Sequence, residues 1–259
     1  MPFANFAGAQ TNAGARVYPS GAKVALSIAG DLYATLEPRF QRTLNPQTIE
    51  MAQTGTPMIG STQSQGCFRR QVFVTQGFID LLNHIAHAKA IDEVEPGYFR
   101  EYVSELALSG DESAPPAPRR LDDPKYWTDS IMNKQASLFN QMVSMTVAVN
   151  LSHHYLDHYA KYASQMPGGK IEPINNFIDA KEWEASVRCA TENSLDCALA
   201  TEGAKTLFDC IDQMSRRPAW AAYIVPPSVN IKKLDHELWR YEHDFFHGAP
   251  QQGRPALGG

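Results

Sequence analysis

The stretch Asn150-Leu-Ser-His153-His154-Tyr-Leu-Asp157-His158-Tyr159 gathers three histidines, an aspartate and an asparagine within a few helical turns. The residues before it, 138–149, are apolar on almost every helical face. A helix that is apolar all round lies in the interior of a domain. Asp123-Pro124 is a helix start signal upstream, and Pro167-Gly168-Gly169 is a stop signal downstream. We therefore expect one long buried helix, around which the rest of the chain is organised.

Helical spacing places the polar residues of this stretch in two neighbouring stripes. His154 and His158 are separated by one turn, the spacing with which two imidazoles can bind one metal ion. Asn150, His153 and Asp157 form the second stripe, where Asp157 can be a ligand or can orient a ligand histidine. Burying so many titratable groups without an ion or partners is costly. The stretch predicts half of a metal site, and the alternative is a set of hydrogen-bonded core histidines.

A second predicted helix, 71–90, has a polar stripe of Asp80, His84 and His87 at helical spacing. Two of these groups can be metal ligands, or one can be a ligand and the other its orienting carboxylate. The alternative interpretation is an exposed polar face. We expect this stripe to supply the second half of the site.

The predicted site combines both halves with one further helix. We expect His84, His154 and His158 as metal ligands and Asp157 or Asp80 as a fourth ligand or an orienting group. His153 and Glu192 are the candidate catalytic residues, with Glu192 acting as a general base. Glu192 belongs to a predicted helix over 179–216, where it can instead pair with Arg188 on a solvated face.

The sequence as a whole indicates an all-α fold. We expect a helical bundle of about five to six helices with long irregular loops and extended terminal arms. The predicted helices cover 23–36, 71–90, a shorter segment after Pro96, the central stretch, 179–216 and 232–246. Residues 43–66 and 109–124 are expected to be loops. The expected organisation is an N-terminal arm over 1–22, a single helical domain over 23–247 and a C-terminal tail over 248–259.

Composition narrows the class of protein. Hydrophobic residues make up 43% and charged residues 20% of the 259 residues, and the net charge is −5. Without a basic run or a long apolar segment, we expect neither nucleic acid nor a membrane as a partner. Four scattered cysteines without a CxxC pair, and the absence of a recognisable signal peptide, favour a cytoplasmic protein.

Histidine and carboxylate ligands without thiolates favour zinc or non-haem iron. We expect a metal-dependent hydrolase or transferase that acts on a small molecule, with a possible homo-oligomeric state. The alternatives are a non-haem metal oxidoreductase on the same bundle and a non-enzymatic helical assembly subunit. A cysteine enzyme built on Cys67 is a more distant alternative. The string His243-Asp-Phe-Phe-His247 has the HxxxH spacing of metalloproteases with aspartate for glutamate, and its relation to the site is open.

Overall fold

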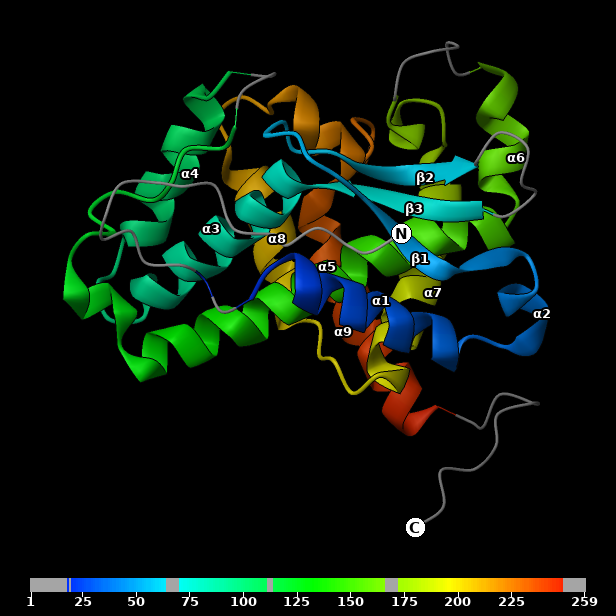
Figure 1. The fold of residues 1–259 in the computed structure, drawn as a ribbon, viewed down its shortest axis with the longest axis horizontal. Helices are drawn as coiled ribbons and strands as arrows, with labels where there is room; N and C mark the ends of the chain where they lie inside the picture. Colours follow the sequence, from blue (N-terminus) through cyan, green and yellow to red (C-terminus); the bar gives the residue numbers. More distant parts are fainter. Residues whose placement is uncertain (1–17, 19, 64–69, 111–113, 166–171, 249–259) are drawn as a thin grey trace.

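The computed structural model describes residues 18, 20–63, 70–110, 114–165 and 172–248. The described chain is mostly helical, with a small three-stranded sheet (Figure 1). The expectation of a helical fold is therefore confirmed in outline, and the expectation of a fold without strands is wrong. The expected terminal arms lie almost entirely outside the described residues.

The helix α5 (Asp129–Tyr155) runs through the middle of the molecule (Figure 1). It contacts α1 (Ala22–Thr35), α3 (Gln76–Asp92), α7 (Ala180–Asp196) and α8 (Glu202–Gln213), and it also packs on the sheet. Nearly every residue from Leu138 to His154 is buried, as expected for a helix that is apolar all round. Buried side chains from Ala25 to Tyr241 form one hydrophobic core around it.

The sheet has the strand order β1-β3-β2, formed by Leu44–Ala52, Arg70–Thr75 and Ile59–Gln63 respectively. The strand β1 pairs with β3 in parallel, and β2 pairs with β3 antiparallel. The central strand has the buried run Val72-Phe73-Val74, whose β-branched and aromatic side chains suit a covered sheet. The predicted loop over 43–66 therefore contains two strands, because pairing with β3 outweighs their polar composition.

The predicted helix over 71–90 begins five residues later than expected, because its first residues form β3. Thr75 ends the strand, and its side chain caps α3 by accepting a hydrogen bond from Phe78 N at 3.2 Å. At Gly77 a side chain would place its Cβ 1.9 Å from Gly55 O, so only glycine fits here. This close approach holds the start of α3 against the β1–β2 connection.

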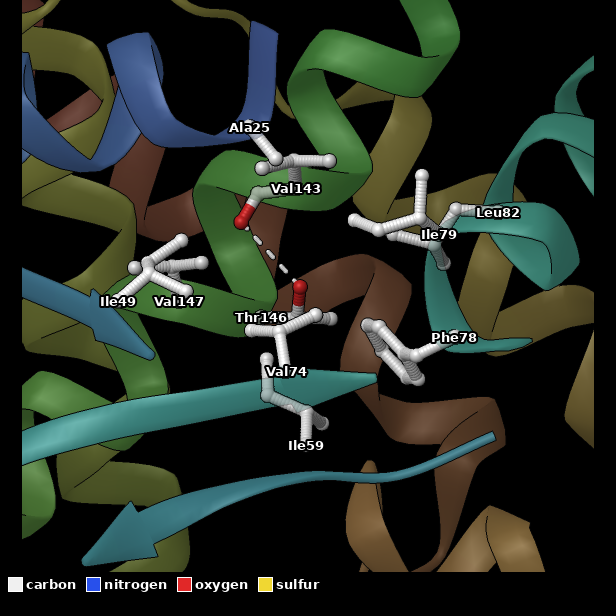
Figure 2. A pocket seen from close by; sticks show the side chains of 10 residues that line it. All are labelled: Ala25, Ile49, Ile59, Val74, Phe78, Ile79, Leu82, Val143, Thr146 and Val147. Atoms are coloured by element: carbon white, nitrogen blue, oxygen red, sulfur yellow. Dashed lines mark hydrogen bonds between the residues drawn. The ribbon is translucent and has the colours of Figure 1, made fainter. Parts of the chain in front are cut away.

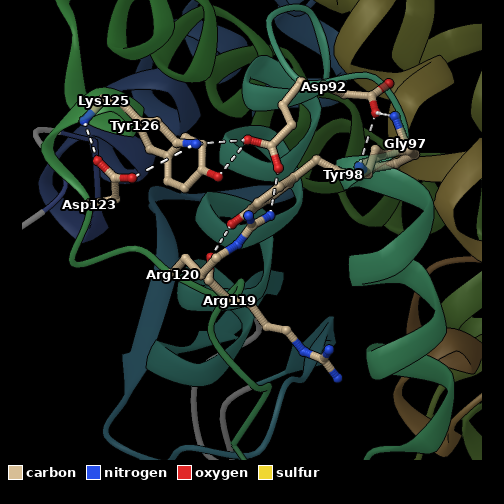
Figure 3. Close-up of polar contacts among 10 residues, drawn as sticks. Asp92, Gly97, Tyr98, Arg119, Arg120, Asp123, Lys125 and Tyr126 are labelled. Carbon is tan, nitrogen blue, oxygen red and sulfur yellow. Dashed lines mark hydrogen bonds and ion pairs between the residues drawn. The ribbon is translucent and has the colours of Figure 1, made fainter.

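The connection that follows α4 (Tyr98–Leu108) is fastened by a charged cluster around Glu95 (Figure 3). The Glu95 carboxylate accepts hydrogen bonds from Tyr126 Oη at 2.7 Å, Arg120 at 2.6 Å and Lys125 at 3.1 Å. These donors, Tyr126 first, lower the pKa of Glu95 to about 2. The cluster fixes the short 3-10 helix Pro124–Trp127, which places Tyr126 and Trp127 beside α3.

Figure 2 shows a small gap in the core between α1, α3, α5 and the sheet. Its lining is apolar apart from Thr146, whose hydroxyl donates to Met142 O at 2.8 Å and approaches Val143 O at 3.2 Å. The gap leaves no room for a water molecule. It is a packing defect of the core and not a ligand site.

The C-terminal half contains more helices than the sequence pattern predicts. The predicted helix over 179–216 is two helices, α7 and α8, because the chain turns at Ala198, whose φ of 58° is left-handed. Small residues let α7 lie close to α5, and Ser144 Oγ donates to Ser194 Oγ at 2.8 Å across that contact. The last helix, α9 (Leu234–His247), packs on α7 and α8. Among the described helices, none combines the length and apolar character required for a membrane span.

Candidate functional site

The histidine stretch does not form one continuous helix. The helix α5 ends at Tyr155, Asp157 adopts a left-handed φ of 61°, and His158 begins the short helix α6 (His158–Tyr162). Arg70 at the start of β3 donates to His154 O at 2.8 Å and to the Asp157 carboxylate at 3.3 Å, which closes the end of α5. The expected one-turn pairing of His154 with His158 is therefore wrong, because the turn at Asp157 redirects His158.

The redirected ring meets His153 instead. The Nδ1 atoms of His153 and His158 lie 3.4 Å apart, and Ser186 Oγ of α7 lies 3.1 Å from the first and 3.2 Å from the second. The three atoms form a nearly equilateral triangle, which we call the His-Ser-His triangle. Ser186 is fully buried, His153 is 1% exposed and His158 is 7% exposed, so bulk water does not compete for these atoms.

The three atoms of the His-Ser-His triangle are linked by polar contacts that share few hydrogens. Ser186 has one hydroxyl hydrogen, and the Glu182 carbonyl oxygen also lies within reach of it at 3.2 Å. His153 Nε2 is buried and has no hydrogen-bond partner among the described residues. A buried polar atom without a partner marks a strained group, a catalytic group or the place of a water or an ion. Within the triangle, His158 Nδ1 can donate to Ser186 Oγ and the serine hydroxyl can donate to His153 Nδ1, which leaves His153 Nε2 as the unpartnered atom.

Burial keeps these rings neutral. Burial lowers the pKa of His153 well below its usual value, and the neighbouring His158 and His154 lower it further. Burial also lowers the pKa of His158, while the Glu182 carboxylate acts in the opposite direction. Neutral imidazole is the form that binds metal ions. Both rings are thus in the state that a metal ligand requires.

Glu182 lies one helical turn before Ser186 on α7, next to the His-Ser-His triangle. Asp179 caps α7 by accepting from Glu182 N at 2.9 Å, but the Glu182 side chain does not complete the capping box. It accepts hydrogen bonds from Lys161 Nζ at 2.7 Å and Tyr162 Oη at 2.6 Å instead. Burial alone would raise the pKa of Glu182, yet these two donors outweigh it and the pKa is lowered. A carboxylate therefore stays ionised between the triangle and solvent.

His154 has a different partner from the one expected. Its Nε2 lies 2.9 Å from the Gln71 carbonyl oxygen, which can only accept, so Nε2 carries the hydrogen. Its Nδ1 then holds a bare lone pair, which is buried and has no hydrogen-bond partner in the described part of the chain. Burial lowers the pKa of His154 to about 4. This ring is neutral and is fixed to β3.

The second predicted half-site lies in a separate cluster. The Tyr18 ring contacts His84, His87 and Trp127, with ring centroids 5.8, 5.5 and 5.4 Å away. His87 is satisfied, because Nε2 donates to Tyr126 O at 2.7 Å and Nδ1 accepts from Tyr18 Oη at 3.2 Å. Burial lowers the pKa of His84 to about 4, and a hydrogen bond to the Pro116 backbone acts in the opposite direction.

The structure thus distributes the predicted ligands over several places. Asp80 accepts from Gln76 at 2.9 Å, and Asp157 pairs with Arg70 with a side chain that is 78% exposed. Across the described ranges, no three His, Cys, Asp or Glu side chains form a group that could hold a metal ion, so the five predicted ligands are not gathered into one. Glu192, the predicted base, pairs with Arg188 at 3.4 Å, which was the alternative for it. Cys67 lies outside the described residues.

Two residues of the site, Ser186 and Glu182, were not selected from the sequence. A serine on a helix rich in small residues is typical of close helix packing, and Glu182 fits the capping box. The available signal is their spacing, because one helical turn separates them and places both on the same face of α7. That face becomes informative only once it is known to meet His153 and His158.

The side chains described above are the observations that bear on the function of this protein. Comparisons with protein-family models, with curated proteins and with solved structures find no match to this chain.

Proposed function

We propose that the protein is a metal-dependent hydrolase whose ion is held by His153 and His158, with Glu182 beside it as the general base. The supporting observation is the His-Ser-His triangle. Zinc binds imidazole nitrogen at about 2.0–2.1 Å in tetrahedral geometry, so two nitrogens on one ion lie about 3.3 Å apart. The two Nδ1 atoms are separated by 3.4 Å. An ion inside this triangle would meet a lone pair of each of the three atoms.

The residues of the chain fit such an ion chemically. Two neutral imidazoles are the ligands that zinc and non-haem iron share, and Ser186 Oγ would be a third, weaker donor to the same ion. A divalent ion bound there lowers the pKa of a bound water and makes it a nucleophile near neutral pH. Glu182 is ionised and can accept a proton, while Lys161 and Tyr162 hold its carboxylate in place. The nearly complete burial of Ser186 and His153 keeps competing water away.

Two charged residues beside the triangle are partly exposed to solvent. The Glu182 side chain is 21% exposed, and Lys161 beside it is 56% exposed. Glu182 and Lys161 are therefore the residues of the site that reach solvent, while Ser186 and His153 are its buried residues. The Lys161 ammonium would attract a substrate with an anionic group, and it would stay close to any charge that develops during hydrolysis.

The test separates the ligand role from the base role. Elemental analysis of the purified protein should find a bound transition-metal ion in the interior site, so that the metal content falls by one ion per chain in the His158→Ala variant. The Glu182→Gln variant should keep the ion and lose most of the turnover measured with a panel of chromogenic esters, amides and phosphoesters. The His87→Ala variant, which changes another buried histidine, is the control that should keep the ion. Retention of the ion by His158→Ala would refute the proposal.

A further inference from the structure

A row of aromatic rings lies along the solvent face of α9. His236, Trp239, His243 and His247 follow each other at spacings of three or four residues, so they share one face of the helix. Their ring centroids lie 6.1, 5.2 and 4.9 Å apart in that order. All four side chains are exposed, and Trp239 is 54% exposed although it is a large apolar residue.

The last two rings of this row have the geometry of a two-ligand metal site. His243 and His247 are separated by one helical turn, their centroids lie 4.9 Å apart and their planes are inclined by 52°. Two nitrogens on one zinc-sized ion can be no more than about 4 Å apart. Rings at this separation reach that distance by rotating about their side-chain bonds, and their exposure leaves them free to do so.

Local charge favours a cation at the same place. His247 is the last residue of α9, where the helix dipole and the final carbonyl groups present partial negative charge. The Asp244 carboxylate lies 3.8 Å from His243 Nδ1 and adds a full negative charge beside the pair. The remaining coordination positions face solvent.

We propose that His243 and His247 form a surface site for a divalent transition-metal ion, separate from the interior triangle. A site of two imidazoles follows the general preference of nitrogen ligands, so copper should bind most tightly, zinc and nickel less tightly and manganese least. Neither ring packs in the core, because Leu234, Leu238 and Tyr241 are the buried residues of α9. Changes at the two histidines should therefore leave the fold intact.

Trp239 provides a built-in reporter for the test. Its ring lies 5.2 Å from that of His243, whereas Trp183 and Trp220 are buried in the core. A paramagnetic ion such as copper quenches the fluorescence of a tryptophan at short range. Titrating the full-length protein with copper should quench a saturable part of the tryptophan emission, and the Trp239→Phe variant should lack most of that part.

The variants decide whether the pair is the site. His243→Ala and His247→Ala should each weaken copper binding at least tenfold, while His236→Ala, on the same face but two turns away from His243, should bind as the wild type does. Circular dichroism checks that each variant is folded. Wild-type titration curves for both His243→Ala and His247→Ala would overturn the proposal.

The same titration distinguishes copper binding at the surface site from copper binding at the interior site. The His158→Ala variant, which would empty the interior site, should leave the quenching of Trp239 unchanged. Loss of the Trp239 signal in His158→Ala, with retention in His243→Ala, would place the copper in the interior and refute the surface site. Loss of interior metal alone would leave the surface site supported.

Discussion

Two buried regions of this molecule contain histidines whose ring nitrogens have different hydrogen-bond partners. In the cluster that Tyr18 and Trp127 form with His84 and His87 of α3, His87 has a carbonyl acceptor on one nitrogen and a hydroxyl donor on the other. At the junction of α5, α6 and α7, His153 and His158 point the same nitrogen atoms at each other and at one serine. Both regions are buried, so burial does not distinguish them. Each region also has one buried histidine nitrogen without a hydrogen-bond partner among the described residues, Nδ1 of His84 and Nε2 of His153. The difference is convergence, because in the second region two Nδ1 atoms meet at one serine.

The largest expected effect is on stability, when each region loses a histidine. Replacing His87 by leucine leaves Tyr126 O and Tyr18 Oη without their partner, which should lower the free energy of unfolding by about 2–4 kcal/mol. Replacing His153 by leucine removes a group whose Nε2 already lacks a partner, so the change should be below about 1 kcal/mol. Urea unfolding in the presence of a chelator measures both. A larger loss of unfolding free energy in His153→Leu than in His87→Leu would contradict this distinction between the two regions.

The pH dependence of stability should report the first region. A histidine in the unfolded chain takes up a proton near pH 6.5, whereas His84 in the fold does so only near its lowered pKa of about 4. The unfolded state therefore binds more protons between these values, and stability should fall as the pH drops from about 6.5 towards 4. The His84→Gln variant, which keeps a hydrogen-bond donor, should show a shallower fall in urea unfolding at pH 7 and pH 5. An unchanged slope would contradict the assignment.

A smaller effect is expected at the serine that joins the two rings. Replacing Ser186 by alanine removes the third polar atom of the triangle, which should weaken metal affinity about tenfold. The matched control is Ser144→Ala, because Ser144 also bridges α5 and α7 by a serine hydroxyl bond of 2.8 Å. Competition with a chromogenic chelator measures both affinities. Equal losses in the two variants would mean that the contact between the helices matters and the triangle does not.

The smallest effect should follow from a change at Asp157. Its left-handed backbone suits glycine, and its exposed carboxylate only pairs with Arg70. Asp157→Gly should change stability by less than about 1 kcal/mol and should leave the metal content unchanged. Loss of the ion in this variant would restore Asp157 as a ligand, as the sequence predicted.

These residues also show which features of the fold can be predicted from sequence patterns. The apolar run of α5 predicted a central buried helix, and helical spacing located most other helices. The strands β1 and β2 were missed because their polar composition indicates a loop, and only pairing with β3 makes them regular. The break at Asp157 was missed because neither glycine nor proline announces it, although aspartate tolerates the left-handed conformation. That single turn exchanged His154 for His153 as the partner of His158.

The position of Ser186 could not be predicted for a related reason. Its role depends on α7 meeting the end of α5 from a distant part of the sequence, and spacing within one helix does not contain that information. The sequence therefore placed several histidines in one buried stretch, but it did not predict which of their rings converge.

The central claim is that His153 and His158 hold one ion together. Its most direct test is a calorimetric zinc titration of chelator-treated protein in a His243→Ala/His247→Ala background, which removes the surface pair. We predict one zinc ion per chain in that background, its loss in both the His153→Ala and the His158→Ala variants, and its retention in the His87→Ala variant. Stoichiometric zinc binding that survives removal of either His153 or His158 would contradict the account.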